Sequence, residues 1–170
     1  MKSLHFLTIL FFSVLISVSC KKSSNDCKLQ VNLHDNPAAY EEVNVDIKDV
    51  ELHSSENGWV SLTTNRGIYD LLKLQGGSDT IIVTSQNFTA VKLQQLRLIL
   101  GTNNTVKVAG TVYPLTLNSQ DETGLKINLN KQLSPSQTYV IDVYFDAAQS
   151  VIDNGNGTYR LKPVLNAEIN

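Results

Sequence analysis

The sequence predicts an all-β protein, folded as a Greek-key β-sandwich of about ten short strands. From residue 27 onward, β-branched and aromatic residues recur with a period of two between clusters of turn residues. No window carries apolar residues at the i, i+3, i+4 and i+7 spacing over the length of a helix. Residues 38–42 alone would permit about one helical turn. Short strands separated by turns favour two packed sheets over alternating strands and helices.

Two strands are predicted in the first part of this region. Leu, Val and Leu alternate over residues 29–33, and Asp35-Asn36-Pro37 ends the run. Over residues 43–52, apolar side chains fall on odd positions up to Ile47 and on even positions from Val50. One extra residue near Lys48-Asp49 therefore predicts a β-bulge, which bends a long strand over the core.

Eight further strands follow from the same alternation between turn residues. They are Trp59–Thr63, Thr80–Thr84, Val91–Leu100, Thr105–Ala109, Thr111–Leu117, Leu125–Leu129, Thr138–Phe145 and Tyr159–Leu165. Ala109-Gly110 and the run Asp153–Gly157 each lie between alternating segments, so both are predicted to form hairpin turns. The Asp153–Gly157 run also offers closely spaced oxygen ligands for calcium, but it lacks the later bidentate Glu of an EF-hand loop, which favours the turn.

The N-terminus has the layout of an export signal. Lys2 precedes an apolar run over residues 6–18, and small residues then lead to Cys20. The run is shorter than the roughly 20 residues that span a bilayer. A cysteine at this place resembles the acylated cysteine of bacterial lipoproteins. We therefore predict a lipoprotein signal peptide over residues 1–19, a lipid on Cys20, a flexible tether over residues 20–26 and one β-sandwich domain over residues 27–170.

An ordinary secretory signal is the alternative for the same segment. Ser17-Val18-Ser19 fits common signal cleavage, and Ser17 stands where lipoprotein signals usually carry Leu. Cys20 and Cys27 would then be able to form a disulfide in an oxidising compartment. With a lipid on Cys20, Cys27 would instead be a buried or unpaired thiol at the start of the fold.

Charge and histidine content exclude several classes of function. Residues 1–19 contain one lysine and no acid, so the remaining chain has 13 basic and 16 acidic side chains, a net charge of about −3. No basic cluster is present, and nucleic-acid binding is not expected. His34 and His53 fall at the ends of separate alternating segments, so no shared metal site and no cofactor are expected.

No motif for catalysis is found, and we do not expect an enzyme. The sequence lacks GxSxG, P-loop, HExxH and CxxC patterns. Asp142 and Asp146 form the best acid pair, on the strand face opposite Ile141, Val143 and Phe145. Their Cα atoms would lie about 13 Å apart along a strand, which suits a structural role better than the paired carboxylates of a glycosidase.

A structural ion-pair network is the hypothesis for the charged residues on these strands. Arg97 points away from the face that carries Leu96 and Leu98, and Asp142 likewise points away from its apolar neighbours. A charge on a partly covered face needs a partner. Arg97 is therefore predicted to pair with Asp142 or Asp146, with Lys162 as a third member of the network.

Trp59 is the single tryptophan and follows a turn. Burial in the core is the more common position for one tryptophan in a β-sandwich. The alternative is an exposed ring that contacts a ligand, with Tyr69 or Tyr40 nearby, as in a carbohydrate-stacking platform.

The chain from about residue 31 to residue 165 resembles a family of bacterial envelope lipoproteins of the Bacteroidetes kind, the domain of unknown function DUF4382. The segments that carry the resemblance are Tyr40-x-x-Val43-x-Val45-x-Ile47-x-x-Val50, Gly58-Trp59, Tyr69-Asp70-Leu71-Leu72-x-Leu74, Leu96-Arg97-Leu98, Gly124-Leu125-Lys126, Asp142–Asp146 followed by Ser150-Val151, and Tyr159-x-Leu161-Lys162-Pro163-Val164. The resemblance implies a β-sandwich of transthyretin-like or immunoglobulin-like character and no reaction.

We therefore expect a non-catalytic module of the cell envelope, anchored to the outer membrane by its N-terminal lipid, that binds an unknown protein or glycan. A structural or assembly component of a surface appendage is the alternative, and a hydrolase is the third reading. Lys21-Lys22 after the lipidated cysteine favours the periplasmic face, since surface-exported lipoproteins of that group often carry acids there.

Overall fold

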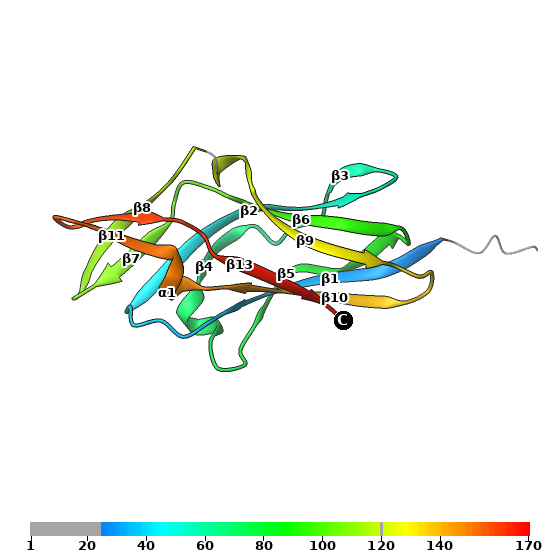
Figure 1. Cartoon of the computed structure of the whole chain (residues 1–170). Helices are drawn as coiled ribbons and strands as arrows, with labels where there is room; N and C mark the ends of the chain where they lie inside the picture. Colours follow the sequence, from blue (N-terminus) through cyan, green and yellow to red (C-terminus); the bar gives the residue numbers. More distant parts are fainter. Residues whose placement is uncertain (1–24, 120) are drawn as a thin grey trace, which may run out of the picture.

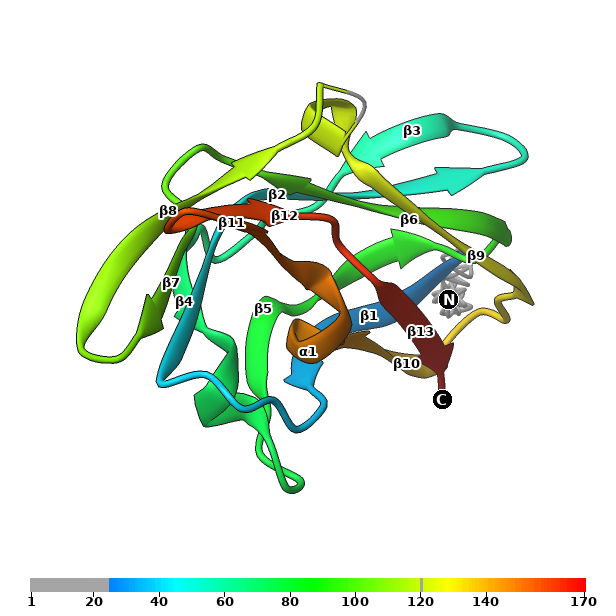
Figure 2. The same cartoon turned by 60° about the vertical axis from the view of Figure 1, so that its left-hand side comes forward.

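The computed structural model describes residues 25–119 and 121–170, so the expected signal peptide, Cys20 and most of the tether lie outside the described residues. Two β-sheets pack against each other in a sandwich-like arrangement (Figures 1 and 2). The all-β sandwich prediction is confirmed, with thirteen strands instead of about ten.

The strands are β1 (Asp26–Asp35), β2 (Glu42–Ser54), β3 (Gly58–Ser61), β4 (Gly67–Asp70), β5 (Thr80–Thr89), β6 (Lys92–Leu100), β7 (Thr105–Val108), β8 (Thr111–Leu117), β9 (Leu125–Gln132), β10 (Thr138–Phe145), β11 (Val151–Gly155), β12 (Thr158–Leu161) and β13 (Leu165–Ile169). Three short helical segments interrupt them, namely η1 (Leu71–Leu74), η2 (Asp121–Thr123) and α1 (Ala147–Ser150).

The smaller sheet has four strands in the order β13-β10-β1-β5. Its centre is a parallel pair, β1 with β10, in which Leu29 lies opposite Tyr139 and Leu33 opposite Val143. The alternation seen in the sequence places Leu29, Leu33 and Val143 on the inner face, where each is fully buried. The other face of these strands carries polar residues.

The larger sheet has nine strands and is organised around β2. The first part of β2 pairs with β4 and β7, and the second part with β3 and β6. Between them the register with β6 shifts by one residue from Ile47 to Asp49, which confirms the predicted bulge. Because of the extra residue, Val45 and Ile47 before the bulge and Val50 after it all face the core.

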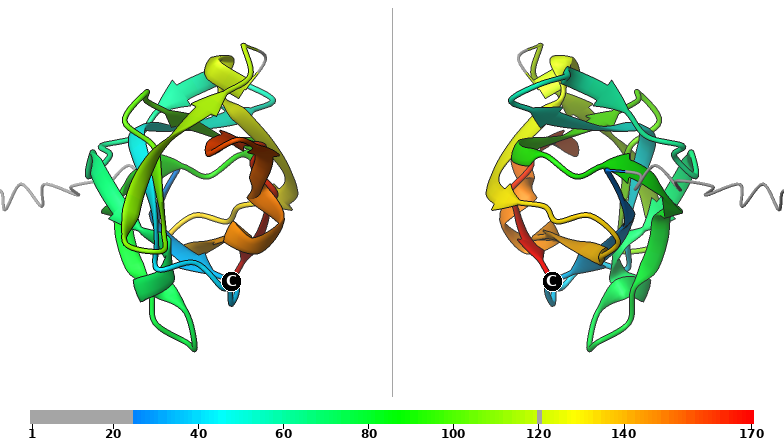
Figure 3. Two further views of the ribbon diagram at one scale, coloured as in Figure 1. Left: turned by 90° about the vertical axis from the view of Figure 1, so that its left-hand side faces the viewer. Right: turned by 90° about the vertical axis from the view of Figure 1, so that its right-hand side faces the viewer.

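Buried apolar side chains from both sheets fill the interior that the strands surround in the end-on views of Figure 3. Both predicted hairpin turns are confirmed. Ala109 and Gly110 have φ of 48° and 77°, as the two central residues of a type I′ turn require, and they connect β7 to β8. Gly155, Asn156 and Gly157 likewise have positive φ and connect β11 to β12.

Several element predictions need correction. Residues 38–42 form no helical turn; they lead into β2, and the one α-helical turn lies instead at Ala147–Ser150, where Asp146 caps it. The strand predicted over Tyr159–Leu165 is two strands, because the chain leaves the larger sheet after β12 and enters the smaller sheet as β13. Pro163 lies in this connection, and proline has no N–H to donate to a ladder.

Candidate functional site

Trp59 lies on the outer face of the larger sheet and not in the core. Its side chain is half-buried, whereas Leu52, which precedes the cross-strand partner of Trp59 in β2, is fully buried. The predicted burial of Trp59 in the core is therefore wrong. The reason is the parity of β2: Val50 and Leu52 face inward, so His53, the cross-strand partner of Trp59, faces outward with it.

Cross-strand registers align two rows of side chains on this outer face. One row is Ser61, Glu51, Arg97 and Lys126, and the other is Trp59, His53, Gln95 and Asn128, each running across β3, β2, β6 and β9. We call these eight residues the Trp59 face. Residues directly opposite each other on neighbouring strands project to the same side of a sheet, so the eight side chains share one surface.

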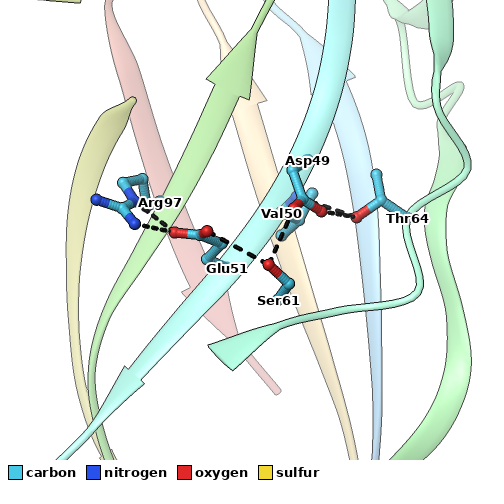
Figure 4. A network of polar contacts seen from close by, with 6 residues as sticks. All are labelled: Asp49, Val50, Glu51, Ser61, Thr64 and Arg97. Carbon is cyan, nitrogen blue, oxygen red and sulfur yellow. Dashed lines mark hydrogen bonds and ion pairs between the residues drawn. The ribbon is translucent and has the colours of Figure 1, made fainter. Parts of the chain in front are cut away.

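Arg97 is held against two residues of the Trp59 face. It donates to Oε2 of Glu51 from Nε, at 2.6 Å, and from Nη2 (Figure 4). Its guanidinium carbon lies 4.3 Å from the centroid of the Trp59 ring, within the range of a cation–π contact. The side chains of Arg97 and Glu51 are 21% and 15% exposed, so the pair is partly shielded from water.

The acids of β2 are held in turn by hydroxyl groups (Figure 4). Oγ of Ser61 lies 2.9 Å from Oδ2 of Asp49 and 3.3 Å from Oε1 of Glu51. The hydroxyl of Thr64 donates to Oδ1 of Asp49 at 3.0 Å, and the N–H of Val50 donates to that oxygen at the same distance. The β2 bulge and the Glu51–Arg97 pair thus belong to one hydrogen-bonded network.

Gly124 allows Arg97 to lie flat along the sheet. Its φ is +102°, and a Cβ at this position would come within 2.6 Å of Cγ and 2.7 Å of Cδ of Arg97. Any larger residue would push the arginine stem away from its place. Gly124 also lines a depression of about 360 Å³ beside Lys126, together with Asp121, Thr123, Leu125, Pro163 and Leu165.

Lys126 is exposed and lies opposite Arg97 in the register of β6 and β9. Its ammonium nitrogen is 5.9 Å from the centroid of the Trp59 ring. Three of the segments that carry the family resemblance, those with Trp59, with Arg97 and with Gly124 to Lys126, therefore meet at one place on the surface.

The predicted pairing of Arg97 with Asp142 or Asp146 is wrong, because these residues belong to different sheets. Arg97 is on β6 of the larger sheet, whereas Asp142 is on β10 of the smaller one. The prediction that Asp142 faces away from the core is correct. The direction of each side chain followed from alternation, but alternation does not say which strands become neighbours.

Asp142 lies in a polar cluster on the outer face of the smaller sheet. Its Oδ1 is 3.0 Å from Nε2 of His34 and accepts from Nδ2 of Asn32 at 3.1 Å. Its Oδ2 accepts from Nδ2 of Asn170 at 3.0 Å. The His34 ring stacks on Tyr144, with 4.8 Å between centroids. The partners of Asp142 are two side chains of β1 in the same sheet and the side chain of Asn170, the residue that follows β13. Contacts within one sheet fit a structural role.

Asp146 caps the helical turn α1. Its carboxylate accepts from the backbone N–H of Gln149 at 2.9 Å and from the side chains of Gln149 and Asn36 at 2.6 and 3.3 Å. Burial acts to raise the pKa of Asp146, but these hydrogen bonds outweigh it and lower the pKa. Lys162 is exposed in the connection between β12 and β13, and its backbone N–H donates to Ser150.

Cys27 is buried in β1 and 2% exposed, and its thiol donates to the carbonyl of Phe88 at 3.3 Å. Burial raises the pKa of the thiol. The lipoprotein hypothesis expects Cys27 to be a buried or unpaired thiol at the start of the fold, and the thiol is buried there. Cys20 itself lies outside the described residues.

In residues 25–119 and 121–170 no three His, Cys, Asp or Glu side chains gather closely enough to hold a metal ion. The Asp153–Gly157 run forms its hairpin turn, in which Oδ1 of Asp153 accepts from the N–H of Gly155 at 2.8 Å. None of the helices in this part of the chain has the length and hydropathy to cross a bilayer.

Sequence reasoning identified two of the eight residues of the Trp59 face, Trp59 and Arg97, and missed the other six and Gly124 as their neighbours. The missed residues of the face are Glu51, His53, Ser61, Gln95, Lys126 and Asn128. A signal existed for Glu51, since it falls between Val50 and Leu52 and so must face outward as Arg97 does. No local pattern indicated the role of Gly124, because it depends on a side chain of another strand.

Comparison with known proteins gives one match. No curated protein and no solved structure matches the chain. A family model described as a domain of unknown function, DUF4382, matches residues 26–163, which include every described strand except β13. The chain therefore belongs to the DUF4382 family.

Proposed function

We propose that the protein is a non-catalytic binding module of the bacterial cell envelope, of the Bacteroidetes lipoprotein type, and that the Trp59 face contacts its ligand. The observation that carries the proposal is the position of Trp59: a large aromatic ring stands outside the core, among polar side chains from four strands. Aromatic side chains with a few fixed polar groups are typical of binding sites, and tryptophan and arginine are enriched among residues that dominate binding energy.

The composition of the face supports binding rather than catalysis. The acid of the face, Glu51, is engaged by Arg97, and the nearby Asp49 is engaged by two hydroxyl groups. Nδ1 of His53 lies 2.7 Å from Oε1 of Gln94, and no acid lies within ion-pair distance of His53 among the described residues. A general base or nucleophile needs a free or activated group within reach of a substrate. Fixed polar groups of this kind instead suit a surface that is prepared for a ligand before the ligand arrives.

The anchoring part of the proposal rests on the sequence. Cys20 directly follows the apolar run, and the buried Cys27 thiol lies at the start of the domain. Lipid on Cys20 would hold the module at the outer membrane, on the periplasmic face. Mass spectrometry of the N-terminal peptide should show a lipid adduct on Cys20, and Cys20→Ser should release the protein from membranes. A disulfide between Cys20 and Cys27 would contradict the proposal.

Binding is tested by presenting the full chain in detergent to arrays of glycans and of envelope proteins. Wild type should bind one class of ligand, and Trp59→Ala should bind at least about tenfold more weakly, since truncating a central aromatic contact costs 1.4 kcal/mol or more. Tyr144→Ala, which changes a half-buried aromatic residue on the outer face of the smaller sheet, is the matched control and should bind as wild type does. Equal binding by wild type and Trp59→Ala would contradict the assignment of the site.

A further inference from the structure

The chemistry of the Trp59 face also indicates what kind of ligand it takes. We propose that the face binds a saccharide that carries a carboxylate or a sulfate group, with Arg97 and Lys126 contacting the anionic group and Trp59 contacting the sugar ring. This inference rests on the proposed function and adds the ligand class to it.

The first support is that the guanidinium of Arg97 is positioned in advance. Glu51 and the Trp59 ring contact it on two sides, and the close approach of Gly124 fixes the Cγ and Cδ atoms of the stem that carries it. One hydrogen bond to Glu51 comes from Nε and the other from Nη2. Among the described residues, no acceptor for Nη1 is found. A guanidinium carries five N–H donors in a planar fork that matches the oxygens of a carboxylate or sulfate. Little ordering of Arg97 would therefore be needed on binding.

The second support is the charge along the first row of the face. Arg97 and Lys126 are direct cross-strand partners, so two cations lie side by side, and Glu51 is the single acid in the row. Like charges directly opposite each other on neighbouring strands are unfavourable. Lys126 has no ion pair among the described side chains, a property that it shares with Lys28, Lys92, Lys131 and Lys162, but Lys126 is the one of these that lies directly opposite an arginine in the register. An anion bound at the β6–β9 side would relieve this repulsion.

The third support is the second row, which suits a sugar. Trp59 offers a half-buried ring at one end, and its neighbours Gln95 and Asn128 offer amides along the sheet surface. His53 offers Nε2, since its Nδ1 lies 2.7 Å from Oε1 of Gln94. The amide of Gln95 donates to Asn128 at 2.9 Å, which fixes the orientation of both. Fixed polar groups beside one aromatic ring match the alternating hydroxyl groups and the apolar face of a pyranose.

The depression beside Lys126 gives room for the ligand to continue. Its volume is about 360 Å³, and it opens next to the cationic end of the face. A larger pocket, of about 510 Å³, lies elsewhere, between the end of β6 and β8, and contains no charged side chain in its lining. The geometry thus favours a saccharide chain that crosses β2 and β6 and places its anionic group at Arg97 and Lys126.

Affinity electrophoresis of the full chain in detergent tests the inference. The gels contain polygalacturonate, dextran sulfate or neutral dextran, so the carboxylate and sulfate sources are separated and the neutral polymer reports binding without an anion. We expect retardation by one or both anionic polymers and none by dextran. Lys126→Met and Trp59→Ala should each weaken the retardation by at least about tenfold, and raised salt should weaken it as well.

The control variant is Lys28→Met, which makes the same charge change on an exposed lysine of β1 in the other sheet. It should migrate as wild type does. Equal loss in Lys28→Met and Lys126→Met would mean unspecific attraction between charges and would overturn the inference. Retardation by neutral dextran that Trp59→Ala abolishes would overturn the anionic ligand class but leave the proposed binding function intact. Absence of retardation by all three polymers would overturn the inference too.

Discussion

At the scale of single residues, Arg97 shows how a charge is accommodated on a sheet surface. The sequence indicated correctly that it faces away from the core and needs a partner, but the partner is Glu51 of β2. Three neighbours of different chemistry hold the side chain: a carboxylate and an indole ring contact the guanidinium, and the backbone of Gly124 lies close to the Cγ and Cδ atoms of the stem. Each neighbour gives a separate way to test the position.

The Arg97–Glu51 pair is expected to stabilise the fold measurably. Arg97→Met should lower the free energy of unfolding by about 2 kcal/mol, because it leaves a partly buried carboxylate without its partner; exposed pairs contribute under about 1 kcal/mol and buried ones 3 to 5 when broken. Urea unfolding of Arg97→Met, Glu51→Gln and the double variant should give a coupling energy of at least about 1 kcal/mol. Arg66→Met, at an exposed arginine, is the control. Additive effects of the two substitutions would contradict the pairing.

A glycine is expected to be required at position 124 for full stability, because any side chain there would collide with the stem of Arg97. Gly124→Ala should destabilise the protein by at least about 1 kcal/mol more than Gly58→Ala, since both residues have positive φ but only the Cβ at Gly124 meets a side chain. The extra loss should shrink in an Arg97→Ala background, where the stem is absent and the contact with Cγ1 of Ile99 at 3.2 Å remains. Thermal or urea unfolding of the two glycine variants, each with and without Arg97→Ala, measures it. An extra loss of the same size without Arg97 would show that the contact is not its cause.

At the scale of elements, β2 organises the molecule. Its bulge was predicted from a change of parity between Ile47 and Val50, and the structure places the register shift there. The chain crossing from β12 to β13 was not predicted, because Tyr159 to Leu165 reads as one alternating run although its two ends enter different sheets. The sequence pattern reports which face a residue takes, whereas the choice of neighbouring strand depends on contacts far along the chain.

The turn α1 depends on its cap, and its contribution should depend on pH. The folded-state pKa of Asp146 is lowered relative to the unfolded value of about 3.9, so the unfolded chain binds more protons in acid. The stabilisation is therefore present above about pH 4 and is lost as the pH falls through the folded-state pKa. Asp146→Ala should cost about 1 kcal/mol at pH 7, as for other helix caps.

Urea unfolding at a series of pH values checks this expectation. The difference between wild type and Asp146→Ala should shrink steadily below about pH 4. A difference that stays constant from pH 7 to the acid end of the series would mean that the carboxylate charge of Asp146 is not what stabilises α1.

At the scale of the whole molecule, the sequence predicted more of the fold than of the candidate site. Period-two patterning and turn residues sufficed for an all-β sandwich and for both hairpins at residues 109–110 and 155–157. The site was beyond such patterns, since Trp59, Arg97 and Lys126 come from three strands that meet only through the registers of β2 and β6. The sequence singled out Trp59 and Arg97 one at a time, with no indication that they touch.

The central claim is that the Trp59 face binds the ligand, and the fluorescence of Trp59 tests it most directly. Trp59 is the single tryptophan of the chain, so all tryptophan emission comes from the proposed site. Titrating the full chain with oligogalacturonate or a sulfated oligosaccharide should give a saturable change in emission that Lys126→Met weakens by at least about tenfold. Unchanged emission at concentrations where the same saccharide retards the protein in a gel would contradict the claim and place the binding surface elsewhere.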